Sequence, residues 1–448
     1  MLVKDKQFYK SFLLLCLPIV LQNVIALSVN LADNIMLGSY SEAALSGATA
    51  VNQIQFIYQN ILMGIGDSMV ILASQYWGKR DTAAMKKIAS VAMRAGLIVM
   101  VVLFAVMSLF PAQVMGLFTS DAAIISEGVN YVSIIRFTYP FFCVSTLLLA
   151  ALRSTEVVGI AFATSLSALV VNCCINWCLI FGNLGFPEMG VRGAAIGTLI
   201  SRIVEMTLIL LFIGLKEKNL GLKLRDFLRL DRQMVRDYFR VGSPIIFLQC
   251  LWGVNNALQT VILGHMTSSA ISANSMASNL FQIVKTVAVG AASTANVIIG
   301  KTIGQGDMKR VREYSKTLQI LFLGIGVCCS ILLFGLTEPV LSLYSLSDES
   351  RELARTFLHI LCVVMLGMSY QMPVNSGIIK GGGDTRYVMK LDLTSIWGIV
   401  VPLSFIMAFV VKASPVAVVW CLNLDQLFKC VPAFIKVNYG HWVKKLTR

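Results

Sequence analysis

Eight long runs of this 448-residue sequence contain no Asp, Glu, Lys or Arg. A helix needs roughly 20 apolar residues to cross the hydrocarbon core of a membrane, and each run is close to that length or longer. We therefore expect an all-α membrane protein with twelve transmembrane helices. The charge-free runs are 11–32, 43–66, 95–120, 157–187, 241–284, 317–337, 356–379 and 393–411. The expected spans lie near 11–38, 44–75, 88–110, 124–152, 157–182, 193–214, 241–264, 270–300, 317–337, 353–378, 388–411 and 414–436.

The basic residues orient these spans. Short cytoplasmic loops are rich in Lys and Arg, whereas outside loops largely lack them. The N-terminus, the loops after even-numbered spans and the C-terminus hold most of the basic residues outside the spans. The other loops hold only Arg192, Arg351, Arg355 and Lys412. We therefore expect both termini in the cytoplasm, which requires an even number of spans.

The composition excludes several classes of function. Charged residues make up 13% of the chain, against about 25% in soluble domains. The net charge of +14 is spread over one set of loops, so topology explains it and we expect no nucleic-acid partner. All eleven cysteines fall in expected spans, and His265, His359 and His441 are dispersed. We therefore expect neither a cofactor nor a metal centre of Cys and His. Without a nucleophile–base pair, we do not expect an enzyme.

The sequence also repeats itself. Pro18 and Pro244 lie 226 residues apart in similar contexts, and the same offset pairs GKRD at 78–81 with GQGD at 304–307. Each half holds six expected spans, so both enter the membrane from the same side as a parallel repeat. We expect two pseudo-symmetric six-helix lobes, at 1–215 and 241–448. The cytoplasmic amphipathic linker at 216–240 is either a tether for lobe movement or a solvated connector beside anionic lipid.

Polar residues inside spans are costly and indicate function. The first span carries one polar stripe, and the fifth carries two amides one turn apart: Asn23, Asn30, Asp33 and Asn34, then Asn172 and Asn176. We hypothesise that Asp33 is a buried carboxylate that binds a coupling cation. The alternatives are a capping or solvated Asp33 at the outer rim, and asparagines that only join helices.

The remaining charged residues of the spans form two groups. Two pairs are spaced to neutralise each other within a helix: Arg202 with Glu205, and Asp425 with Lys429. Three others have no partner evident from the sequence: Asp67, Arg136 and Lys285. Asp67 and Lys285, together with the three asparagines of the first span, are candidates for lining a substrate cavity.

Six motifs in this order resemble the multidrug and toxic compound extrusion (MATE) family over nearly the whole chain. They are DNIMLG at 33–38, QYWGKRD at 75–81, NCCINWCLIFG at 172–182, GVRGAAIGT at 190–198, GKTIGQGD at 300–307 and KGGGDT at 380–385. The segment RSTE at 153–156 departs from the glycine-rich form of the family.

The resemblance implies a monomeric antiporter of a bacterial cytoplasmic membrane. Such a protein exports small organic, often cationic compounds by alternating access, driven by an inward H⁺ or Na⁺ gradient, with membrane lipids as its other partners. The resemblance also implies a cation site formed by Asp33, Asn172, Asn176 and Thr198, in which an amide replaces the family's second acid. The acids that some members carry on helices 7 and 10 are absent at 249–252 and 369–372.

Two questions remain open at this point. A proton needs one carboxylate, whose charged form burial disfavours, whereas sodium would need Asp33 together with the neutral oxygens of its neighbours. We favour the proton, and we expect no metal site other than this alternative Na⁺ site at Asp33. The alternative function is that of a lipid-linked precursor flippase of the same superfamily, which would need more basic residues facing the cavity.

Overall fold

The computed structural model describes residues 3–228, 231–264, 268–343 and 347–447. Over these residues the chain is built from helices, and its β-type pairing is an isolated bridge between Gly383 and Val443. The chain divides into two compact units. The N-terminal unit comprises Leu21–Ala73 and Asp81–Gly242, and the C-terminal unit comprises Met1–Val20, Ser74–Arg80 and Ser243–Arg448. The start of the first helix and the end of the second thus group with the second half of the sequence.

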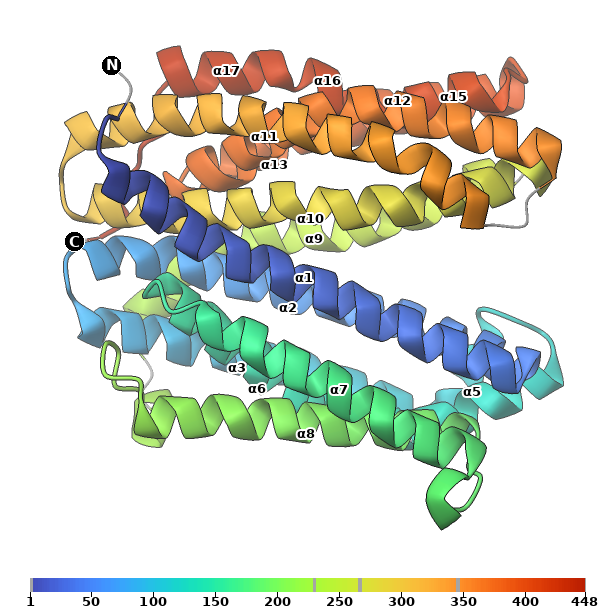
Figure 1. Ribbon diagram of the computed structural model, residues 1–448. Helices are drawn as coiled ribbons and strands as arrows, with labels where there is room; N and C mark the ends of the chain where they lie inside the picture. Colours follow the sequence, from blue (N-terminus) through green and yellow to red (C-terminus); the bar gives the residue numbers. More distant parts are fainter. Residues whose placement is uncertain (1–2, 229–230, 265–267, 344–346, 448) are drawn as a thin grey trace. The chain divides into compact units, whose positions relative to one another are not determined.

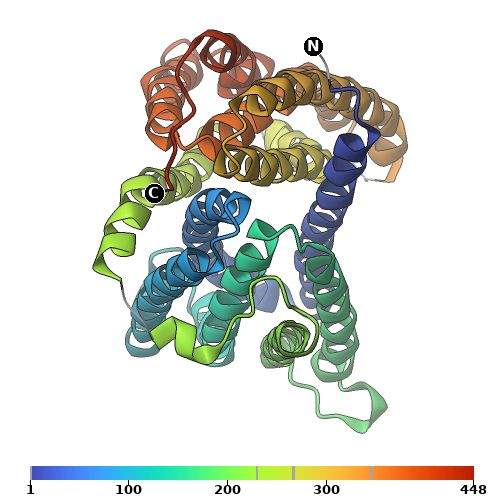
Figure 2. The same cartoon turned by 90° about the vertical axis from the view of Figure 1, so that its left-hand side faces the viewer.

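Long apolar helices build the N-terminal unit; Figure 1 shows them from the side and Figure 2 along their axes. One of its helices begins, and two of its helices end, in segments of the other unit. Its helices are α1 (Lys6–Tyr40), α2 (Glu42–Gly78), α3 (Thr82–Leu109), α4 (Pro111–Gly116), α5 (Ala122–Ile135), α6 (Thr138–Ser154), α7 (Gly159–Phe181), η1 (Asn183–Gly185), α8 (Val191–Leu215), η2 (Leu224–Leu228) and the start of α9 (Arg232–Gly264).

The span expected near 124–152 is not one straight helix. It consists of α5 and α6, which meet at an angle of 55°. Pro140 in the first turn of α6 has no N–H to donate to the carbonyl of Arg136, and the Thr138 hydroxyl donates instead to the carbonyl of Ile135 at 2.6 Å. The expected fourth span is therefore present as a bent pair of helices, because a proline and a back-bonded threonine interrupt it.

The C-terminal unit contains the rest of α9 and shorter helical pieces toward the end of the chain. These are α10 (Ser268–Gly304), α11 (Met308–Leu343), α12 (Asp348–Met372), η3 (Pro373–Ile379), α13 (Thr385–Asp392), η4 (Leu393–Val400), α14 (Val401–Phe405), η5 (Ile406–Val410), α15 (Pro415–Asn423), α16 (Asp425–Phe428) and α17 (Cys430–Tyr439). The segments η3, η4 and η5 are π-helical. Pro373 begins η3, and Pro402 follows η4, which agrees with the tendency of proline to disturb the α-helical hydrogen-bond ladder.

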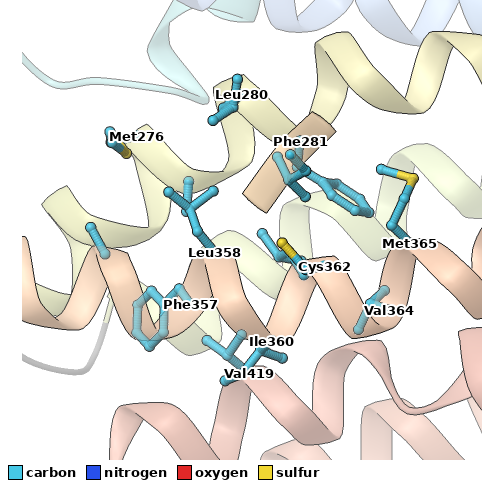
Figure 3. Close-up of a cluster of buried hydrophobic side chains, with 14 of the residues drawn as sticks. Met276, Leu280, Phe281, Phe357, Leu358, Ile360, Cys362, Val364, Met365 and Val419 are labelled. Atoms are coloured by element: carbon cyan, nitrogen blue, oxygen red, sulfur yellow. The ribbon is translucent and has the colours of Figure 1, made fainter. Parts of the chain in front are cut away.

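The core of the C-terminal unit lies between α10, α12 and α15. Figure 3 shows Phe281 of α10 beside Met365 of α12, with Val419 of α15 on the other side of α12. Phe357 and Met365 are fully buried. Burying such side chains contributes roughly 1.5–3 kcal/mol each relative to exposure, so this cluster holds the three helices together.

The helices agree with the expected number of membrane spans. Among the described residues, ten helices are long and apolar enough to cross a membrane, and the bent pair α5–α6 supplies an eleventh. Helix α9 is not among these, but its part from 241 to 264 contains no Asp, Glu, Lys or Arg and is longer than the roughly 20 residues that a span needs. With α9 the described helices provide twelve spans, as the sequence predicts.

The linker expected at 216–240 contacts α3 of its own unit. Lys86 donates to the carbonyl of Gly221 at 2.7 Å and forms an ion pair with Asp226 at 3.2 Å. Ser90 donates to the carbonyl of Phe227 at 3.0 Å. The last residues of the expected linker already belong to α9, so its helical part is continuous with a span.

The repeated motifs share a backbone conformation. Arg80 and Gly306 occupy equivalent repeat positions, and both adopt a left-handed conformation, with φ of 60° and 81°. Glu156 and Gly383 form a second such pair, with φ of 65° and 91°. Glycine adopts this conformation without the steric cost that a side chain imposes. The departure from glycine in the RSTE segment therefore leaves the turn intact and places a strained residue in it.

Candidate functional site

Four side chains on three helices of the N-terminal unit form one buried polar cluster. Asp33 lies on α1, Asn172 and Asn176 on α7, and Thr198 on α8. The Asn176 amide donates to Asp33 Oδ1 at 2.6 Å and to Asn172 Oδ1 at 3.3 Å. The Asn172 amide donates to Thr198 Oγ1 at 3.3 Å. The structure therefore brings together the four residues that the family resemblance implies.

Close packing of α7 on α8 makes this cluster possible. The two asparagines lie one turn apart and so share the face of α7 that meets α8. On α8, a Cβ added at Gly197 would overlap the amide oxygen of Asn176, and one added at Gly193 would lie 2.6 Å from the carbonyl oxygen of Leu179. The two glycines thus allow the helix backbones to approach. Sequence reasoning did not single them out, although both lie in the GVRGAAIGT motif.

The cluster is shielded from solvent and contains one carboxylate. Asp33 is 9% exposed, and Asn172 and Asn176 are fully buried. Among the residues that the structure describes, no Lys or Arg lies within ion-pair distance of Asp33. Arg202, one turn beyond Thr198, instead pairs with Glu205 at 2.8 Å and stacks on Phe142 at 4.7 Å. The predicted neutralisation of Arg202 by Glu205 is confirmed, and Asp33 is held by neutral donors.

One polar atom of the cluster has no hydrogen-bond partner. The side-chain oxygen of Asn176 is buried and accepts no hydrogen bond from the described residues. An unpaired buried acceptor costs roughly 1–3 kcal/mol, so such atoms tend to have a further partner. Tyr131 of α5, also buried, lies close to Thr198 and adds a second hydroxyl to the surroundings of the cluster. The sequence offered no signal for Tyr131.

The other polar residues of α1 lie outside this hydrogen-bonded cluster. Asn23 is half-buried, whereas Asn30 and Asn34 are exposed. Because α1 turns by about 100° per residue, the asparagine stripe lies to one side of Asp33. These three amides remain candidates for contacting a substrate, and Asp33 turns away from them into the protein.

Asp67 and Lys285 have partners that the sequence did not reveal. Asp67 of α2 forms an ion pair with Arg153 of α6 at 2.8 Å. The Lys285 ammonium of α10 lies 4.9 Å from the centroid of the Trp252 ring of α9. Both partners lie on a different helix, which sequence spacing cannot predict. The Arg136 guanidinium lies 5.1 Å from the ring centroid of its neighbour Phe137 and 5.9 Å from that of Phe104 on α3.

The C-terminal unit contains a second buried polar cluster, with a different charge pattern. Lys429 forms ion pairs with Asp425 at 2.9 Å, as the spacing predicts, and with Asp392 of α13 at 2.8 Å. The positions at 249–252 and 369–372 contribute no acid. Gln371 instead donates to Gln426 at 2.7 Å. A lysine thus occupies the space between the two carboxylates of this cluster.

Comparison with known proteins identifies the family. The twelve apolar helices define a polytopic membrane protein, and the sequence model of the MatE family matches residues 18–178 and 244–406. The chain therefore belongs to the MatE family of transporters. The two matches begin at Pro18 and Pro244, which confirms the internal repeat predicted from the sequence.

Similar proteins cover almost the full length of the chain. It is 23% identical to the probable multidrug resistance protein NorM of Thermotoga maritima, over 98% of this chain and 94% of that protein. It is also 23% identical to the probable multidrug resistance protein YoeA of Bacillus subtilis, over 90% of this chain and 88% of that protein.

Solved structures share the fold. An outward-facing multidrug resistance MATE family transporter of the MOP superfamily has a TM-score of 0.86 at 17% identity, covering 98% of both chains. A MOP superfamily transporter from Pyrococcus furiosus has a TM-score of 0.85 at 16% identity, covering 96% of this chain and 95% of that one. The all-α, twelve-helix fold class predicted from the sequence is therefore confirmed.

Proposed function

We propose that this protein exports small organic compounds, drug-like and often cationic, by antiport with an inward-moving cation. The names of its relatives in Thermotoga and Bacillus support this substrate class. We further propose that it acts as a monomer in a bacterial cytoplasmic membrane, with both termini in the cytoplasm, and alternates between inward-open and outward-open states. The observation that carries the proposal is a buried carboxylate, Asp33, which accepts a hydrogen bond from an amide and has no Lys or Arg within ion-pair distance among the described residues.

This environment suits Asp33 to exchange a cation. An ionised carboxylate is costly to bury when no charge compensates it, so a bound cation stabilises the closed cluster. When the cluster opens to water, solvation and the Asn176 donor stabilise the ionised form, and the cation leaves. The side chain can therefore alternate between a loaded state and an empty state as access changes.

We propose the proton as this cation. Asp33 is the single carboxylate of the cluster, and binding a proton removes its charge without requiring further ligands. Sodium would need several oxygens, and the unpaired oxygen of Asn176 is the observation in its favour. Asp67 neutralises Arg153, so this arginine is not free to bind an anionic lipid-linked precursor, and this pairing favours drug export over the flippase alternative.

Transport in proteoliposomes tests both parts of the proposal. We expect efflux of a fluorescent organic cation under a pH gradient without sodium, and none under a sodium gradient at matched pH. The Asp33→Asn variant should fold but lose uphill efflux. Glu338→Gln, which removes an exposed carboxylate of α11, serves as the control and should transport normally.

The outcomes distinguish the choice of the proton as coupling ion from the role of Asp33 as its site. Efflux confined to the sodium gradient would replace the proton by sodium and leave the role of Asp33 intact. Uphill efflux by Asp33→Asn at the wild-type rate would refute the site. Transport of a lipid-linked sugar and not of organic cations would refute drug export.

A further inference from the structure

A groove runs between α11, α12 and α17 of the C-terminal unit. Figure 1 shows these three helices in the same part of the fold. The groove has a volume of about 750 Å³, within the range that holds small ligands. Gly367 forms part of its floor, where α12 packs so closely on α16 that an added Cβ would lie 2.5 Å from the carbonyl oxygen of Gln426.

The walls of the groove are apolar and open to the surroundings. Ile320, Leu323 and Phe434 line it, and about half of each side chain is exposed. At its base, the Tyr370 hydroxyl donates to Gln319 at 2.8 Å, and the Asn438 amide donates to the same oxygen at 3.0 Å. Exposed apolar side chains on membrane-spanning helices are suited to hydrocarbon chains. The amide and hydroxyl groups add polar contacts beside this apolar surface.

A basic stripe leads along α11 into this groove. Lys309, Arg312 and Lys316 continue through Gln319 to Leu323 on one face of the helix, because these positions recur every three or four residues. Among the described residues, none of the three cations lies within ion-pair distance of an acid. Lys316 itself lines the groove. A ligand here would therefore meet positive charge at one end and hydrocarbon surface at the other.

We propose that this groove binds an anionic phospholipid of the cytoplasmic leaflet. The headgroup phosphate contacts Lys316 and the stripe before it, and an acyl chain lies against Leu323 and Phe434. On the predicted topology, the start of α11 faces the cytoplasm, where basic residues near the membrane attract anionic lipid. The stripe carries the wrong charge for an exported organic cation, so a lipid fits this surface better than the transported compound.

Native mass spectrometry of the full-length protein tests the proposal. The protein is purified with equal amounts of phosphatidylglycerol and phosphatidylcholine, and retained lipid is counted for each variant. The wild type should retain phosphatidylglycerol preferentially. Lys316→Gln should lower its retention about fivefold. Lys390→Gln, which removes an exposed lysine of α13 in the same unit, should leave retention unchanged.

A second pair of variants tests the apolar wall. Leu323→Trp fills the groove and should reduce retention, whereas Ile331→Trp changes an exposed residue two turns further along α11 and should not. Equal retention of both lipids, or equal effects of Lys316→Gln and Lys390→Gln, would overturn the proposal. Displacement of the lipid by a transported cation would assign the groove to the substrate instead. All of these readings are independent of the coupling ion and of Asp33.

Discussion

Asp33 is the acidic residue of α1 that the structure places against α7. The polar stripe of α1 could be identified from the sequence, because helical periodicity brings residues 23, 30, 33 and 34 to one side of an apolar helix. The hydrogen bond from Asn176 to the Asp33 carboxylate could not be predicted in this way, because it joins residues 143 positions apart in the chain. The family resemblance indicated which four residues belong together, and the structure shows the hydrogen bonds that join them.

The sequence did not reveal the partners that charged residues find on other helices. The pair Asp425–Lys429 follows from helical spacing, but Asp392 joins it from α13. Likewise, Arg153 lies just beyond the expected span near 124–152, so the sequence does not indicate that it pairs with Asp67 of α2. Such contacts depend on how helices pack, which a single sequence does not specify.

The amide of Asn176 offers a test of what sets the coupling ion. Asn176→Asp would place a second carboxylate within hydrogen-bond reach of Asp33. Two adjacent carboxylates repel each other and attract a shared cation, so we expect efflux to become sodium-dependent. The wild type, by contrast, should show no dependence of efflux on sodium concentration.

Proteoliposome efflux measured over a range of sodium concentrations at constant pH checks this expectation. Asn183→Asp, in η1 outside the cluster, is the matched control. Unaltered sodium dependence in Asn176→Asp would mean that the amide does not determine the choice of ion.

At the scale of elements, the repeat is visible in how helices end and begin. Asp81 and Asp307 both follow a left-handed residue, and each accepts a hydrogen bond from the backbone N–H three residues later, at 3.0 Å. The matching segments GKRD and GQGD therefore adopt the same local structure, which is a left-handed turn followed by a capped helix. The spans themselves were predictable because apolar length determines them, whereas the bend between α5 and α6 arises from local hydrogen bonding at Pro140 and Thr138, which hydropathy does not indicate.

Arg80, which is not a glycine, is strained in this left-handed conformation, whereas its repeat partner Gly306 is not. A left-handed conformation costs a side-chain-bearing residue roughly 1–2 kcal/mol, and glycine's greater chain entropy offsets part of the gain. Arg80→Gly should therefore raise the free energy of unfolding by about 0.5–1 kcal/mol. Gly306→Ala should lower the free energy of unfolding by a similar amount because of the left-handed backbone. A steric clash would not contribute, since an added Cβ there meets no atom within 4 Å.

Thermal unfolding in detergent, measured for both variants, checks the pair. Gly324→Ala, a helical position where a Cβ also meets no atom, controls for the loss of glycine entropy. A destabilised Arg80→Gly would show that the arginine side chain contributes more than the turn costs.

Asp384 anchors the C-terminal tail to the KGGGDT motif. It forms ion pairs with Lys444 at 2.7 Å and Lys436 at 3.0 Å, and the N–H of Lys444 donates to the carbonyl of Gly382 at 2.7 Å. Burial disfavours the charge of Asp384, but the two ammonium groups outweigh this effect and hold its pKa below the ordinary value of 3.8.

This pKa predicts how stability depends on pH. Because the pKa is lower in the folded protein, the ionised carboxylate stabilises the fold above about pH 4, and this contribution is lost as pH falls through the lower folded value. Asp384→Asn should therefore lower the free energy of unfolding by about 1–2 kcal/mol at pH 7. The difference from the wild type should shrink below pH 4. Thermal unfolding of both proteins from pH 7 to pH 3 measures it, and a difference that persists at pH 3 would contradict the ion-pair explanation.

At the scale of the whole molecule, hydropathy and charge determine most of what the sequence could predict. Twelve apolar segments, the two matching halves and the family all follow from patterns that extend over hundreds of residues. Internal breaks in the spans, such as the π-helical segments between Pro373 and Val410, do not, because they arise from local hydrogen bonding that leaves hydropathy unchanged.

On the proposed coupling through the single carboxylate Asp33, with Arg202 paired to Glu205, the charge that one transport cycle carries across the membrane is limited. One proton exchanged for one monovalent organic cation moves no net charge, so membrane voltage, worth about 2.3 kcal/mol per charge at 100 mV, cannot drive that exchange. A neutral compound exchanged for the same proton would move one charge inward.

In proteoliposomes with a potassium diffusion potential, the rate of efflux of a monovalent cation should therefore be independent of the potential, while the rate of efflux of a neutral compound should depend on it. Voltage-dependent efflux of the monovalent cation would require a second charge in the cycle. The charge of each compound would then decide whether an energised cell expels it by its pH gradient alone or by its voltage as well.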